Sequence, residues 1–136
     1  MKYLPLTRID LLVVHASGAT DGDIGAAELR RRHRSRGWRH IGYHFVVRRD
    51  GSLEEGRPTN MPGGHENRVN RRSLGVCLVG GGNDATPAQL TTLATLATDL
   101  KTWLPELEVV GHRDVPGVRT SCPGFSVRDW WDGLSH

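Results

Sequence analysis

Apolar residues recur along the chain in short aliphatic runs separated by turn-forming residues, a pattern typical of buried strands. The first run ends in the β-branched pair Val13 and Val14. The tripeptide Arg49-Asp50-Gly51 is a turn signal that joins two of the runs into a hairpin. We therefore expect strands over residues 9–14, 41–48, 52–55, 74–79 and 107–110.

The clearest helix signal follows the third long run. Thr86, Pro87 and Gln89 combine an N-cap, a proline at the first helical position and a capping-box partner. Leucine and alanine then recur at helical spacing as far as Leu104, and Pro105 ends the pattern. These signals predict an amphipathic helix between the N-cap and the proline.

Two further helices are expected. One covers residues 24–36, with Asp23 as its N-cap and Gly37 just past its end. The other begins after Ser126 and carries two consecutive tryptophans. Residues 56–73 lack periodicity and are expected to form a long surface loop, which in a small domain usually serves a function. Helices that alternate with strands predict an α/β fold with a central mixed β-sheet flanked by helices.

Length and composition place the chain among small globular proteins. We expect residues 1–136 to form a single domain and a monomer. Apolar residues make up 37% and charged residues 24%, which argues against wholesale disorder. The longest aliphatic run, 11–14, is too short to span a membrane, and the start of the chain lacks the apolar stretch of a secretory signal. Two cysteines exclude a disulfide framework.

Arginine supplies almost all of the positive charge, and the formal net charge is +3. The first predicted helix is crowded with arginines, namely Arg30, Arg31, Arg32, Arg34 and Arg36. We interpret them as a solvated helix face. The alternative is attraction to an anionic polymer such as cell-wall carboxylates or lipopolysaccharide phosphates. Because the chain carries no recognised nucleic-acid motif, we expect no nucleic-acid partner.

Two histidines and one cysteine stand where a site on a sheet would form. His15 follows the first predicted strand, His112 follows the last one, and Cys122 lies in a loop ten residues later. Two imidazoles and one thiolate suit zinc, and three protein ligands leave a fourth position for water, as in catalytic zinc sites. Spacing alone leaves other interpretations open. A histidine after a strand is more often a hydrogen-bonded loop residue, and Cys122 can be an inert small hydrophobe.

The other titratable residues near these motifs have structural interpretations. Cys77 lies inside a predicted strand and is the structural cysteine of the two. Tyr43 and His44 are neighbours on a predicted strand, so only one of them can face the same site as His15. His33 lies among the arginines of the first helix and is expected to be exposed to solvent.

Four motifs in a fixed order carry a family resemblance. They are VVHAS at 13–17, IGYHFVVRRDG at 41–51, SLGVCLVGG at 73–81, and GHRDV followed by TSCPGF within 111–125. With these motifs the chain resembles the zinc-dependent N-acetylmuramoyl-L-alanine amidases of type 2, a family that includes peptidoglycan recognition proteins and short phage endolysins. The resemblance covers nearly the whole chain, and its compact length is most similar to the single-domain phage enzymes.

The resemblance implies a mixed sheet flanked by helices, with a zinc cleft on one face. His15, His112 and Cys122 match the positions of the metal ligands, so Zn²⁺ is the implied cofactor. Tyr43 matches the catalytic tyrosine. Thr120 occupies the position of a second catalytic residue, which is lysine in many phage members and threonine in other members of the wider family.

The implied substrate is peptidoglycan, cleaved at the amide between the lactyl group of N-acetylmuramic acid and L-alanine of the stem peptide. His65 and Asn67 lie in the loop that borders the substrate groove in relatives, so they are candidate substrate contacts. The alternative to an enzyme is a non-catalytic peptidoglycan-binding module, because relatives that lack a zinc ligand only bind. The complete ligand set and Tyr43 favour the enzyme.

Two biological roles fit an amidase of this kind. The sequence shows no signal peptide and no second wall-binding domain, which favours a phage or prophage endolysin made in the cytoplasm of the infected bacterium. Such a protein needs a membrane-permeabilising partner to reach the wall. A bacterial amidase that recycles cytoplasmic muropeptides is the alternative.

Overall fold

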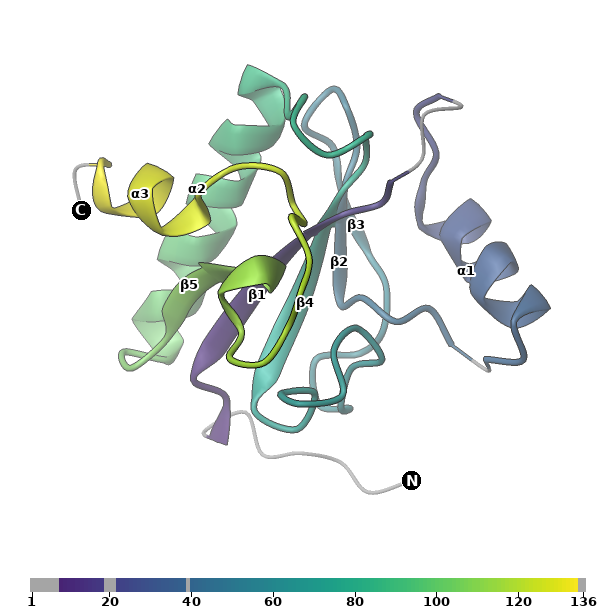
Figure 1. The fold of residues 1–136 in the computed structure, drawn as a ribbon, viewed down its shortest axis with the longest axis horizontal. Helices are drawn as coiled ribbons and strands as arrows, with labels where there is room; N and C mark the ends of the chain where they lie inside the picture. The colour runs from purple at the N-terminus through teal and green to yellow at the C-terminus, as the bar shows by residue number, and fades with distance from the viewer. Residues whose placement is uncertain (1–7, 19–21, 39, 135–136) are drawn as a thin grey trace.

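The structure is a computed structural model that describes residues 8–18, 22–38 and 40–134. A five-stranded sheet with the strand order β3-β2-β4-β1-β5 forms its centre (Figure 1). Among the described residues, no helix is both long enough and apolar enough to cross a membrane.

The sheet is mixed, as the sequence predicts. β1 (Leu11–Ala16) lies in the middle and pairs in parallel with β4 (Ser73–Leu78) on one side and β5 (Glu108–Gly111) on the other. β2 (Phe45–Val47) pairs in parallel with β4. β3 (Leu53–Glu55) is antiparallel to β2 and forms the second arm of the predicted hairpin. Most strand bounds lie within two residues of the predicted ones.

Helices and loops together cover the two faces of this sheet (Figure 1). α2 (Pro87–Trp103) and the short α3 (Val127–Asp132) pack on one face, where Trp131 joins the largest apolar cluster. α1 (Ala26–Ser35) packs on the opposite face through Leu29. Burial of both faces explains why the central parallel strands are aliphatic along their length.

The alternation of side chains along β1 determines which residue faces the functional site. Leu12 and Val14 pack into the cluster beneath α2. Val13 points to the other face, and His15 shares its parity, because successive side chains of a strand alternate between faces. The sheet therefore presents the ring of His15 on the face opposite α2.

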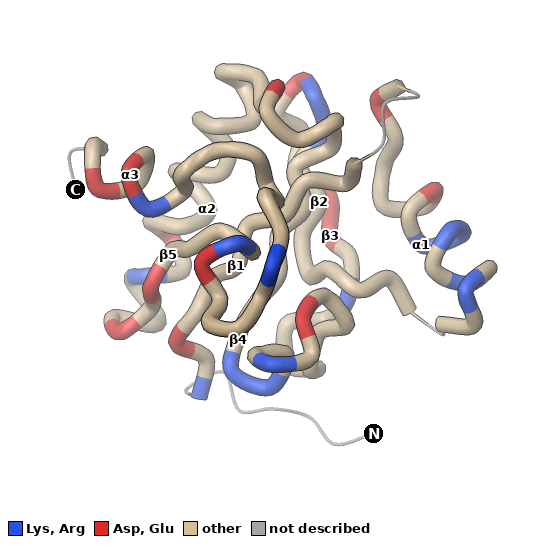
Figure 2. The backbone as a smooth tube through the Cα atoms, in the orientation of Figure 1, with Lys and Arg blue, Asp and Glu red and all other residues tan. Residues whose placement is uncertain are grey.

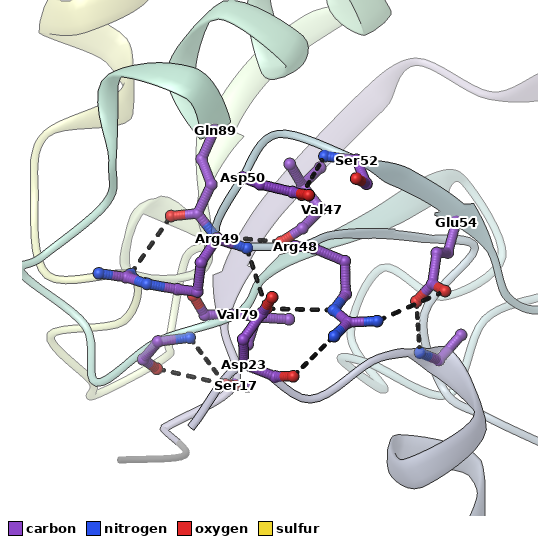
Figure 3. Close-up of polar contacts among 12 residues, drawn as sticks. Ser17, Asp23, Val47, Arg48, Arg49, Asp50, Ser52, Glu54, Val79 and Gln89 are labelled. Atoms are coloured by element: carbon purple, nitrogen blue, oxygen red, sulfur yellow. Dashed lines mark hydrogen bonds and ion pairs between the residues drawn. The ribbon is translucent and has the colours of Figure 1, made fainter. Parts of the chain in front are cut away.

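The predicted start of α2 is confirmed in detail. The Thr86 hydroxyl accepts a hydrogen bond from the Gln89 amide N–H at 3.0 Å, and the Gln89 side chain accepts one from the Thr86 N–H at 3.0 Å. Gln89 is fully buried, and its side-chain amide also donates to the carbonyl oxygens of Val47 (3.0 Å) and Val79 (2.9 Å) (Figure 3). The capping residue thus also joins α2 to the sheet.

The predicted start of α1 is wrong. The helix begins at Ala26, and Asp23 does not cap it: the Asp23 carboxylate accepts hydrogen bonds from Arg48 Nε (3.1 Å) and from the Arg49 N–H (3.0 Å) (Figure 3). A residue from β3 caps the helix instead, because Glu54 Oε1 accepts from the Ala26 N–H at 2.8 Å. A Cβ on Gly25 would lie 2.5 Å from that oxygen, so glycine is needed there for Glu54 to reach the helix.

This capping contact leads to a prediction about stability. Replacing Glu54 with alanine leaves an N-terminal N–H of α1 without its acceptor, so we expect a loss of about 1 kcal/mol in the free energy of unfolding. Urea unfolding measures it. Glu54→Gln keeps an acceptor oxygen and should lose less, and Glu55→Ala, at an exposed neighbouring position, is the control. An unchanged urea midpoint for Glu54→Ala would contradict the contact.

The strand predicted over 41–48 is shorter than expected, because only Phe45–Val47 pair as β2. The preceding residues bond elsewhere: the Gly42 N–H donates to His33 Nδ1 at 2.9 Å. The prediction that His33 is exposed to solvent is therefore wrong. His33 is buried, and its ring lies 4.7 Å from that of Trp38, centroid to centroid. A polar residue on an arginine-rich helix can be buried when the backbone of another segment supplies its hydrogen bond.

Arginines follow closely on one another along α1 (Figure 2), where Arg31 and Arg34 are exposed and Arg30 and Arg32 are half-buried. Glu28 accepts hydrogen bonds from Arg31 (2.6 Å) and Arg32 (3.0 Å) on the same helix. These contacts hold the pKa of Glu28 at about 2. The pattern is that of a solvated, internally paired helix face.

Candidate functional site

The three predicted metal ligands come together at the end of the sheet. His15 is the fifth residue of β1, rather than the residue after it, and His112 opens a short 3-10 helix (η2, His112–Asp114) directly after β5. Cys122 arrives from the loop that follows. One potential ligand atom from each of the three residues lies within 4.8 Å of the others.

Backbone contacts hold the cysteine in this position. The Ala16 N–H donates to Cys122 Sγ at 3.3 Å, and the Cys122 N–H donates to Thr120 Oγ1 at 3.1 Å. Burial raises the pKa of the Cys122 thiol, and the hydrogen bond from Ala16 offsets part of that effect. Without a metal the group is therefore a thiol, and a bound metal would have to displace its proton.

Each site histidine has a partner on its Nε2 atom. His15 Nε2 lies 2.9 Å from Nδ1 of His65, and His112 Nε2 lies 2.8 Å from Oε2 of Glu66. Burial lowers the pKa of His15 well below its usual range and that of His65 to about 3, so both rings are neutral near pH 7. Burial also raises the pKa of Glu66, but the hydrogen bonds from His112 and Arg68 outweigh it and bring the value to about 2.

Tyr43 lies beside this group. Its ring centroid is 5.2 Å from that of His15. Burial raises the pKa of the phenol far above its usual value, so the group keeps its proton, and the thiol of Cys77 is a polar neighbour of the hydroxyl. Sulfur is a weak acceptor, so this neighbour does not prevent the hydroxyl from donating to a substrate oxygen, which is a stronger acceptor.

An open cleft of about 520 Å³ adjoins the cysteine. Its lining comes from three segments. They are the end of β1 with Ala16, the loop after β4 with Gly81, Gly82 and Asn83, and the loop after η2 with Cys122 and the exposed Thr120. The Thr120 oxygen already accepts from the Cys122 N–H, which leaves its O–H available to donate. In the cleft the hydroxyl can therefore donate a hydrogen bond, but it brings no charge.

The structure separates the two candidate substrate contacts. Asn67 is exposed, and its side-chain oxygen accepts from Asn70 at 3.4 Å. The ring of His65 contacts His15 through Nδ1 and Ser73 through Nε2, at 3.0 Å from the hydroxyl oxygen. Both nitrogens of His65 are thus engaged within the protein, whereas Asn67 can reach solvent. A substrate contact remains a prediction for both residues.

Glu66 contacts the grouped residues but was not among those predicted from the sequence. It directly follows His65 in the long loop over 56–73, but its partner His112 is 46 positions away in the chain. The pattern of charged and apolar residues along the sequence does not indicate a contact between residues so far apart in the chain. The only hint is that the loop as a whole was expected to be functional.

The residues of this group fit zinc. Two imidazole nitrogens and one sulfur are the donor types that zinc prefers, and ligand atoms around a tetrahedral zinc ion lie roughly 3.3–3.7 Å apart. The separation of at most 4.8 Å needs only a small contraction. A metal-binding histidine usually donates its second N–H to a carboxylate or another acceptor, and both His112 and His15 have such a partner here.

Comparison with known proteins places this geometry in a family. The sequence pattern of the N-acetylmuramoyl-L-alanine amidase family matches residues 5–125. The chain belongs to this family. The family resemblance carried by the four motifs is thereby confirmed, and the protein is an N-acetylmuramoyl-L-alanine amidase.

Several relatives share most of the amidase's length. The endolysin of Klebsiella phage KP32 is 39% identical over 129 residues, which cover 89% of this chain and 84% of the phage protein. The N-acetylmuramoyl-L-alanine amidase LysC from Clostridium intestinale URNW superposes with a TM-score of 0.80 at 31% identity, over 96% of this chain and 88% of LysC. Bumblebee PGRP-SA superposes with a TM-score of 0.84 at 26% identity, over 98% and 85% of the two chains. The predicted fold class is confirmed by these superpositions.

Proposed function

We propose that this amidase is zinc-dependent, with His15, His112 and Cys122 as the metal ligands. The observation that carries the proposal is the approach of three zinc-type donors to within 4.8 Å of one another beside an open cleft. In this proposal the chain acts as one domain and a monomer on peptidoglycan, and it cleaves the amide between N-acetylmuramic acid and L-alanine. Zinc would supply a more acidic water and a Lewis acid for the scissile carbonyl.

The residues of the chain supply the remaining catalytic groups. Tyr43 keeps its proton because burial raises its pKa, so its role is to donate a hydrogen bond to the carbonyl oxygen as negative charge develops there. The Thr120 hydroxyl, exposed in the cleft, donates a second and weaker hydrogen bond. Because threonine carries no charge, it stabilises an oxyanion less than the lysine found at this position in many phage members.

The role of Thr120 can be tested by removing only its hydroxyl. We expect Thr120→Val to lower kcat by about fivefold, because one neutral hydrogen bond contributes roughly 1 kcal/mol. Valine also removes the acceptor of the Cys122 N–H, but the variant should keep its zinc, since Thr120 is not among the three ligands and the Ala16 N–H still contacts Cys122 Sγ. Turnover of isolated wall fragments and the zinc content measure the two effects. Unchanged kcat would show that Thr120 takes no part in the reaction.

The proposed reaction can be tested on purified peptidoglycan sacculi. Mass spectrometry should show stem peptides with a free L-alanine amino group and glycan strands without peptides. A chelator should abolish the release, and added zinc should restore it. A module that only binds peptidoglycan would sediment with the sacculi and release no peptide.

We further propose that the enzyme serves as an endolysin. The support is its identity of 39% to a phage endolysin over most of both chains. The enzyme would accumulate in the cytoplasm of the infected bacterium and reach the wall when a membrane-permeabilising partner opens the way. Assays of intact sacculi and of soluble anhydro-muropeptides, run side by side, test this role. An endolysin cleaves the sacculi efficiently, whereas a recycling amidase prefers the soluble fragments.

A further inference from the structure

We propose that the dipeptide His65-Glu66 is a positioning unit for both histidine ligands, holding each ring in the tautomer that leaves Nδ1 free for zinc. The inference rests on the proposed zinc site and assigns a role to two neighbouring residues that are not themselves ligands. Its basis is a pair of hydrogen-bond chains, one to His15 and one to His112. In each chain the group at the far end can only accept a proton from the ring beside it, and this determines which nitrogen of the ring carries the proton.

The chain to His15 begins in the protein interior. The Ser73 hydroxyl donates its single proton to the carbonyl oxygen of Val69 at 2.7 Å. Its oxygen, 3.0 Å from His65 Nε2, must therefore accept a proton from that nitrogen. A neutral His65 protonated at Nε2 has a lone pair on Nδ1.

That lone pair determines the tautomer of His15. His65 Nδ1 lies 2.9 Å from His15 Nε2 and accepts its proton. The lone pair of a neutral His15 is then on Nδ1, which is the nitrogen left for a metal. Each residue therefore donates one proton to the next: His15 donates to His65, His65 donates to Ser73, and Ser73 donates to the carbonyl oxygen of Val69.

The chain to His112 is shorter and ends on a charge. Glu66 Oε2 lies 2.8 Å from His112 Nε2, and an ionised carboxylate can only accept, so Nε2 carries the proton. The other carboxylate oxygen of Glu66 accepts from Arg68 at 3.0 Å, which holds the group in place. The Glu66 side chain is only 10% exposed, so the contact is largely shielded from water. Nδ1 of His112 is again the free nitrogen.

The dipeptide is itself held from two sides. The Asn70 side-chain oxygen accepts from the N–H groups of both His65 (3.0 Å) and Glu66 (2.9 Å). The ring of His65 lies against the backbone of β4, where a Cβ on Gly75 would come within 2.7 Å of its Cγ. The hydrogen bonds to Asn70 and the close approach to Gly75 therefore leave the dipeptide little freedom to move.

The first test measures tautomers in zinc-free protein, by long-range proton–nitrogen NMR of the imidazole rings near pH 7.5. We expect His15, His65 and His112 of the unmodified protein to carry their protons on Nε2. Glu66→Ala should introduce an Nδ1–H population at His112 alone, and Ser73→Ala should do so at His65 and His15 alone. A purely structural role would not give this specificity, and unchanged tautomers in both variants would overturn the inference.

The second test measures zinc affinity by competition with a chromophoric chelator. Loss of such a partner typically weakens metal binding by 10- to 100-fold, so we expect that range for Glu66→Ala and for Ser73→Ala. Glu66→Gln keeps an acceptor oxygen and should retain more affinity than the alanine variant. Glu106→Ala, which removes an exposed glutamate in the turn before β5, is the matched control and should bind like the unmodified protein.

The outcomes separate this inference from the proposed function. If the unmodified protein binds one zinc ion through Cys122 and both alanine variants bind it equally well, the positioning role is wrong and the zinc site stands. If the unmodified protein binds no zinc, the proposed site is wrong and the inference fails with it. Weaker binding in the two alanine variants, with the control unchanged, supports both.

Discussion

Cys122→Ser is expected to lose zinc and, with it, nearly all hydrolysis of peptidoglycan. The thiolate is the only anionic donor among the three proposed ligands, and a serine hydroxyl is a poor zinc ligand that keeps its proton near neutral pH. We expect zinc affinity to fall by at least about 100-fold, beyond the effect of removing a residue that only orients a ligand. Metal analysis after dialysis, together with release of stem peptides from sacculi, measures both consequences.

The second cysteine provides the control for this experiment. Cys77 is fully buried in β4 and lies in register with His15, but it is not among the three grouped donors. Cys77→Ala should therefore keep stoichiometric zinc, although it removes the sulfur that contacts the Tyr43 hydroxyl. A Cys122→Ser protein that still holds one tightly bound zinc ion would refute the ligand assignment.

Tyr43→Phe is expected to reduce kcat by on the order of 10²–10³ while leaving zinc in place. The substitution removes one hydroxyl and keeps the ring that packs beside His15. Loss of a single preorganised donor to a developing oxyanion typically has an effect of this size. Turnover of a defined muropeptide, measured at saturating substrate, gives the change in kcat apart from any change in binding.

Zinc content and stability are the controls for the tyrosine variant. The polar neighbour described for the Tyr43 hydroxyl is the sulfur of Cys77, which is a weak acceptor. Removal of the hydroxyl should therefore change the urea midpoint little. A phenylalanine variant with normal zinc, normal stability and full activity would exclude Tyr43 from the chemistry.

The sequence predicted those elements whose signals are local. The start of α2 needs only Thr86, Pro87 and Gln89, which lie within one helical turn, and it forms as expected. The aliphatic runs predicted the strands because a sheet covered on both faces requires apolar side chains on both sides. The predicted start of α1 was wrong because its signal is not local. The acceptor that caps the helix, Glu54, lies on β3, and Asp23 accepts hydrogen bonds from Arg48 and Arg49 of the hairpin.

The candidate site shows the same division. The resemblance identified His15, His112, Cys122 and Tyr43 one by one, and the structure brings them together. The resemblance could not reveal Glu66 or the acceptor role of Ser73. Glu66 contacts His112 and Ser73 contacts His65 only when the loop that precedes β4 has folded. Such contacts depend on where two distant segments meet.

By itself, the sequence determined the strands, the long helix and the types of donor atom that this amidase can offer to a metal. Hydrophobic periodicity and capping act over a few residues, so they are readable along the chain. Only the tertiary structure decided that Nε2 of His15 faces His65 and that Nε2 of His112 faces the carboxylate of Glu66. Those choices depend on hydrogen-bond partners from separate segments, and such partners meet only when the sheet and its loops have packed.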